Sequence, residues 1–104
     1  MIVFDLTFAV DTEVELLATQ IYERFGRSFE PRYSDYLGGD YYVSSGDPEI
    51  IVHRNLDGND VAEADFEDYR VLLQVNGCLD KNVWQYWTMG IGGVFVRDCQ
   101  YEKS

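Results

Sequence analysis

The chain has 104 residues, with 8 Lys and Arg against 19 Asp and Glu, and a formal net charge of −11. This length fits one domain over residues 1–104. Hydrophobic residues make up 46% and aromatic residues 15%, which excludes a disordered acidic tail. The sequence contains no apolar run of about 18 residues, so it predicts no membrane helix. The basic residues are too few to neutralise phosphates, which argues against direct nucleic-acid binding. The first ten residues lack a basic segment and include Asp5, so we expect no secretory signal and a cytoplasmic protein.

The N-terminal part of the chain predicts a strand followed by a long helix. Apolar residues alternate strictly over 2–10, as in a half-buried strand. Over 12–25 they recur at helical spacing and form one apolar stripe. We expect Thr12 and Glu15 to form a capping box at the start of this helix, and Gly26 to end it in the left-handed conformation.

The remaining elements are shorter and are separated by Gly, Pro and Ser. Residues 27–39 have the composition of an irregular connection, and 56–68 that of a polar acidic loop. Strands are expected at 40–44, 49–55, 69–76 and 94–101, and a short helix capped by Asp80 at 80–88. The predicted fold class is α+β: a mainly antiparallel sheet of about five strands with one long helix packed on one face, in the order β-α-β-β-β-(α)-β.

Negative charge is concentrated in the middle of the chain. Between Glu30 and Asp68 there are eleven acidic residues against two basic ones, and residues 57–68 hold six acids and no base. A solvated acidic face that favours solubility is one explanation. The acids are, however, interleaved with tyrosines, which protein interfaces favour as rigid amphipathic anchors, and a basic partner would relieve the self-repulsion.

We therefore predict a partner-binding surface in this segment, and expect about half of its tyrosines to pack on the core instead. The candidate residues are Tyr33, Asp35, Tyr36, Asp40, Tyr41, Tyr42, Asp57, Asp60, Glu63, Asp65, Glu67 and Asp68.

Metal binding has little support in the sequence. The stretch from Asn55 to Asn59 resembles the start of an EF-hand loop, but its sixth and twelfth positions are Asp60 and Phe66, where that loop needs Gly and Glu. His53 is the only histidine and lies in a predicted strand, so we expect it to be a hydrogen-bonded structural residue.

Catalysis has no better support. Cys78 and Cys99 are interpreted as reduced thiols, although the sequence leaves a single bridge between them open. With 19 acids, some pair of carboxylates will always be close, so no pair is informative. We predict no catalytic residue, no metal and no cofactor, and a protein that is not an enzyme.

Several segments resemble the small immunity proteins of contact-dependent growth inhibition and related polymorphic toxin systems. The resemblance covers about residues 2–76 and is carried by YLGGDYY at 36–42, EIIV at 49–52, NLD at 55–57 and YRVLL at 69–73. It implies a bacterial protein that binds and neutralises a cognate toxin domain, often a basic nuclease, and here we expect a ribonuclease in a 1:1 complex. Two alternatives stay open: an acidic nucleic-acid mimic that inhibits a DNA-binding protein, and a small ligand-binding domain with a pocket near His53.

Overall fold

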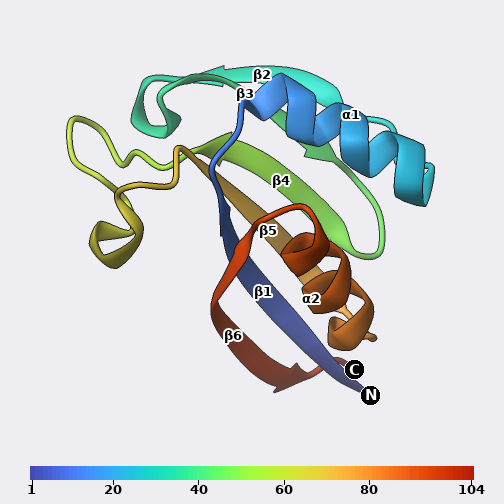
Figure 1. Ribbon diagram of the computed structural model, residues 1–104. Helices are drawn as coiled ribbons and strands as arrows, with labels where there is room; N and C mark the ends of the chain where they lie inside the picture. Colours follow the sequence, from blue (N-terminus) through green and yellow to red (C-terminus); the bar gives the residue numbers. More distant parts are fainter.

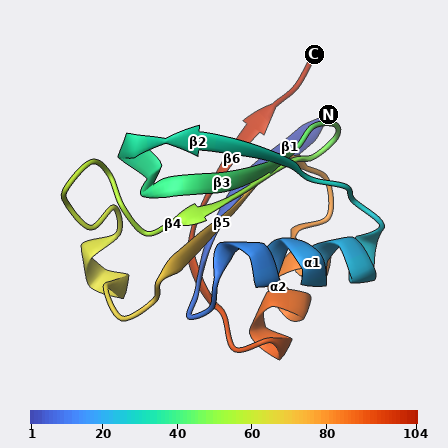
Figure 2. The same ribbon diagram turned by 90° about the horizontal axis from the view of Figure 1, so that it is seen from above.

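The computed structural model describes residues 1–104 as one antiparallel six-stranded sheet with two α-helices. The strands lie in the order β2-β3-β4-β5-β1-β6. Both helices lie on the same face of the sheet, and the opposite face carries no helix (Figures 1 and 2). The elements are β1 (Ile2–Val10), α1 (Val14–Phe25), β2 (Glu30–Ser34), the short 3-10 helix η1 (Asp35–Leu37), β3 (Gly39–Ser44), β4 (Glu49–Arg54), the 3-10 helix η2 (Ala64–Phe66), β5 (Val71–Cys78), α2 (Lys81–Gly90) and β6 (Val94–Glu102).

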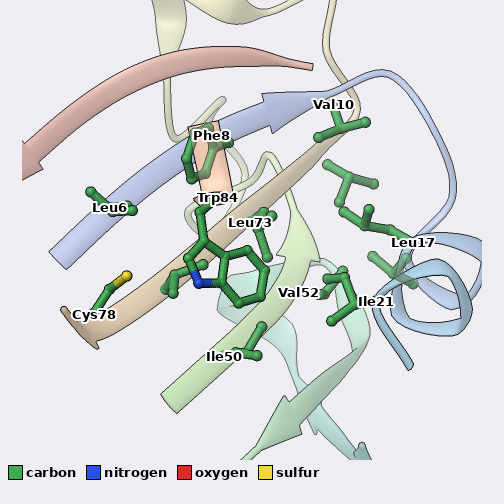
Figure 3. Packing of buried hydrophobic residues seen from close by; sticks show 13 residues of the cluster. Leu6, Phe8, Val10, Leu17, Ile21, Ile50, Val52, Leu73, Cys78 and Trp84 are labelled. Atoms are coloured by element: carbon green, nitrogen blue, oxygen red, sulfur yellow. The ribbon is translucent and has the colours of Figure 1, made fainter. Parts of the chain in front are cut away.

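The core lies between the sheet and the helices. Leu6 and Phe8 of β1 point to this side, as the strict alternation predicts, and are fully buried (Figure 3). Leu17 and Ile21 of α1 pack against the same cluster, which confirms the predicted apolar stripe. Trp84 of α2 completes the cluster over the β1 end of the sheet.

An aromatic contact joins the two helices. The ring of Phe25, at the end of α1, stacks on Trp84 with 4.2 Å between centroids, and meets Trp87 edge-on at 5.3 Å. Such pairs add to the stabilisation from buried area. The short helix predicted after Asp80 is therefore a part of the helical layer, and the Asp80 side chain caps it by accepting from the Val83 N–H at 3.4 Å.

Two predictions of local structure were wrong. The expected irregular connection contains β2 and η1, and β2 is the sixth strand of a sheet predicted to have about five. Strand β2 is an edge strand with most of its side chains exposed and Pro31 in it, so it lacks the apolar alternation that identifies a strand. The capping box is absent because α1 begins at Val14 and its N-cap is Glu13, with no side-chain cap.

The α+β class itself is confirmed, as is the left-handed Gly26 with φ 69°. Neither helix has the length and apolarity needed to span a membrane. Cys78 is buried and Cys99 exposed, and both are free thiols. Burial raises the pKa of the Cys78 thiol.

Candidate interaction surface

The first half of the predicted surface is the turn between β2 and β3. Tyr33 and Tyr36 are each 69% exposed, and the carboxylates of Asp35 and Asp40 are exposed beside them. The Tyr33 hydroxyl donates to Asp35 Oδ1 at 2.9 Å. This hydrogen bond and the negative charge of Asp35 raise the pKa of Tyr33, so its phenol remains a neutral donor.

The second half is the loop between β4 and β5, and one buried side chain holds it in shape. Asn55 is 5% exposed, and its amide Nδ2 donates to the carbonyls of Phe66 and Tyr69, both at 3.0 Å. Its Oδ1 accepts from the Glu63 N–H at 2.8 Å. Since all three bonds go to the backbone, they define the path of the loop whatever its exposed side chains are.

The two halves meet at one end of the molecule (Figure 1). The N–H of Gly58 donates to the carbonyl of Tyr36 at 2.9 Å, and the Tyr36 ring lies over this glycine. Arg54, at the end of β4, donates through Nη1 to the carbonyls of Gly38 and Asp40 at 3.1 and 3.0 Å. Arg54 and Asn55 are consecutive, so the end of one strand positions both halves. We call this joined region, residues 33–42 and 55–70, the acidic tip.

Most carboxylates of the acidic tip are exposed and have no cationic partner. Seven of its acidic side chains take part in no ion pair: Asp35, Asp40, Asp57, Asp60, Asp65, Glu67 and Asp68. The nearby cations are already engaged, because Arg32 pairs with Glu30, Arg70 with Asp11 and Glu13, and Arg54 with backbone carbonyls. Bonds to carbonyls leave the positive charge of Arg54 in place, but seven unpaired carboxylates outnumber it, so the tip carries a net negative charge.

Three of the predicted surface residues have a different place. Glu63 has a side chain that is only 17% exposed, because it pairs with Arg97 of β6, whose hydrogen bond lowers the pKa of that carboxyl. Tyr42 packs against the core cluster, and Tyr41 is half-buried on the helix-free face of the sheet. Glu63 and Tyr42 are therefore engaged within the chain, whereas Tyr41 stays partly exposed.

The Glu63–Arg97 pair also links the loop to strand β6. Arg97 of β6 lies opposite Thr7 of β1 on the helix-free face. The loop ends at β5, and β6 is two strands further along the sheet. Leu72 and Ala9 face the same side and are buried at 2% and 0% exposure, although no helix covers them.

His53 is the structural residue that the sequence indicates. It is buried, its Nδ1 donates to the Arg54 carbonyl at 2.6 Å, and its Nε2 accepts from Gln74 at 3.2 Å. Burial lowers its pKa, so the imidazole is neutral. His53 lines none of the four main hollows of the surface, and no three His, Cys, Asp or Glu side chains are placed to hold a metal ion.

Sequence reasoning did not identify Arg54 and Asn55 as the residues that assemble the tip. Their partners are backbone atoms up to sixteen positions away, which no local pattern reports. Comparison with family models, with curated proteins and with solved structures gives no match to this chain.

Proposed function

We propose that this protein is a cytoplasmic immunity protein, which binds a cognate basic bacterial toxin domain through the acidic tip and so neutralises it. The observation that carries this proposal is the set of exposed, unpaired carboxylates around Tyr33 and Tyr36, held on a frame of backbone-directed hydrogen bonds. A preorganised surface binds with less loss of conformational entropy than a flexible one. The resemblance of residues 2–76 to immunity proteins points to the same role.

The chemistry of the tip suits a nuclease active site. Such a site binds phosphates with Lys, Arg or His side chains, and carboxylates of the inhibitor take the place of the phosphates. Charge-assisted bonds of this kind give fast, steered association, while Tyr33 and Tyr36 supply the apolar contact area that desolvates the centre of an interface. We infer that the cognate toxin is a ribonuclease and that the complex is 1:1.

The distribution of charge favours this role over mimicry of a long nucleic acid. A mimic needs carboxylates spaced along the whole surface, as phosphates are along a duplex. Here the acids outside the tip include several that are neutralised within the chain: Asp11 and Glu13 by Arg70, Asp47 by Lys103, and Asp98 by Lys81. A small ligand-binding domain has less support, since His53 lies outside the main hollows.

The decisive experiment reverses charge at the tip without touching its frame. Asp57 and Asp60 are exposed and unpaired, so we expect the double variant Asp57→Lys, Asp60→Lys to fold normally. Its association with a basic toxin domain that the wild type binds should be slower by about tenfold or more, with a weaker dependence on salt than the wild type. Stopped-flow or surface-plasmon measurements at several ionic strengths give both quantities.

A matched control separates local from overall charge. Glu15 and Glu23 are exposed, unpaired acids on α1, so Glu15→Lys, Glu23→Lys changes the net charge by the same amount away from the tip. This control should bind the toxin domain nearly as fast as the wild type. Equal rates for the tip variant and the wild type, with intact circular dichroism, would refute the proposal.

A further inference from the structure

A second surface feature lies along α2. This helix is on a part of the molecule away from the acidic tip (Figures 1 and 2). A groove of about 890 Å³ runs along this helix beside the end of α1, and is lined among others by Arg24, Asp80, Val83, Tyr86, Trp87 and Met89. Its volume is at the upper end of the range of about 300–1,000 Å³ that ligand sites occupy. It belongs to neither the tip nor the core.

Three apolar side chains that line the groove are open to solvent, beside polar ones such as Asn82 and Gln85. Tyr86 is 85% exposed and Met89 65%, and Val83, three residues before Tyr86, is 40% exposed. Their spacing of three residues puts them along one side of the helix. A contiguous apolar stripe on a small acidic protein is typical of a surface that another protein covers.

The charges beside the groove balance each other. Arg24 is the only one of the eight Lys and Arg side chains with no hydrogen bond or ion pair, and its guanidinium lies 4.9 Å from the centre of the Phe25 ring. Asp80 is exposed at the start of α2 and has no cationic partner. The groove is therefore nearly neutral in a chain of net charge −11. Copies of this chain repel each other least at such a face.

We propose that the groove binds a second copy of this chain, so that two α2 helices pack around a twofold axis. In a twofold interface both copies use the same surface patch. If residue i of one copy contacts residue j of the other, residue j of the first copy also contacts residue i of the second. An antiparallel pairing of α2 brings the apolar stripes together and sets Arg24 of one copy against Asp80 of the partner subunit, twice. This use of the free cation distinguishes self-association from a chance apolar patch. The acidic tips remain accessible, so this inference does not depend on the proposed function.

Sedimentation velocity of the full chain, from about 1 μM to about 1 mM, tests the proposal over the range of weak and moderate dimers. We expect a concentration-dependent dimer. Tyr86→Glu puts a charge at the centre of the interface and should weaken the dimer by about a hundredfold or more. Tyr22 is a 53% exposed tyrosine on α1 outside the groove, so Tyr22→Glu is the matched control and should leave the dimer unchanged.

The ion pair has its own test. Asn is a good helix cap, so Asp80→Asn removes the charge and keeps the cap. Asp80→Asn and Arg24→Gln should each weaken the dimer by about threefold to tenfold, and the double variant should be no weaker than either single one. A wild type that stays monomeric throughout, an equal loss with Tyr22→Glu, or fully additive losses in the double variant would each overturn the proposal.

Discussion

Replacing Asn55 by alanine removes the three side-chain hydrogen bonds that shape the loop between β4 and β5. The Phe66 carbonyl keeps a bond from the Tyr69 N–H, but the Tyr69 carbonyl and the Glu63 N–H lose their Asn55 partner. At about 1 kcal/mol for each bond, with a further penalty for buried groups left unpaired, we expect a loss of about 2–4 kcal/mol in the free energy of unfolding. A domain of ordinary stability still folds after such a loss.

Chemical denaturation followed by tryptophan fluorescence measures this loss, and hydrogen exchange locates it. The amide of Glu63 should exchange faster in Asn55→Ala, because its acceptor is gone. Asn59 is exposed in the same loop and makes no side-chain hydrogen bond, so Asn59→Ala should stay within about 0.5 kcal/mol of the wild type. Our reasoning fails if the two alanine variants are equally stable and the Glu63 amide stays protected.

Two further predictions concern the backbone and pH. Gly38→Ala should destabilise the fold more than Gly92→Ala. Both glycines have a positive φ, but only at Gly38 would a Cβ meet a neighbour, Leu56 Cδ1, at 2.8 Å. The free energies of unfolding of the two variants, measured by thermal unfolding, should differ by about 1–3 kcal/mol, and equal melting temperatures would contradict the steric argument. Because burial lowers the pKa of His53 from 6.5, the unfolded state takes up its proton first as the pH falls, so stability should decline below about pH 6.5 by up to about 1.4 kcal/mol per pH unit. Urea unfolding at pH 7.5 and pH 5.5 should show this decline in the wild type and not in His53→Gln; an identical decline in both would assign it to other groups.

The elements that could be predicted from the sequence are those in which the spacing of apolar residues shows which side of the element is buried. Strand β1 and helix α1 each put apolar residues on one side of the sheet, so periods of two and of 3.6 residues identify them. Strand β2 buries almost nothing, and its hydrogen bonds to β3 leave no trace in its composition. Thr12 and Glu15 match a capping box in letters, but the helix starts later than the pattern requires.

The sequence predicts which acidic residues and tyrosines the tip contains. It does not predict how they are arranged in space. Counting charges located its carboxylates, since exposed loops tolerate them. Which tyrosines are exposed follows from strand register: Tyr42 lies opposite Val52 of β4 and faces the core, whereas Tyr36 lies in η1 beyond the end of the strands. The contacts of Arg54 and Asn55 with distant carbonyls depend on the folded chain, so no local sequence signal identifies them.

The acidic tip separates the residues that build the loops from those that face outward. Arg54 and Asn55 bind backbone carbonyls and one backbone N–H, groups that every amino acid except proline possesses, so the outward side chains are exchangeable without rebuilding the loops. Exchanging Asp57 or Asp65 for a neutral residue would even relieve repulsion among neighbours. Mutation can therefore redirect recognition while selection for folding acts elsewhere, which lets descendants of one ancestor diverge quickly in what they recognise.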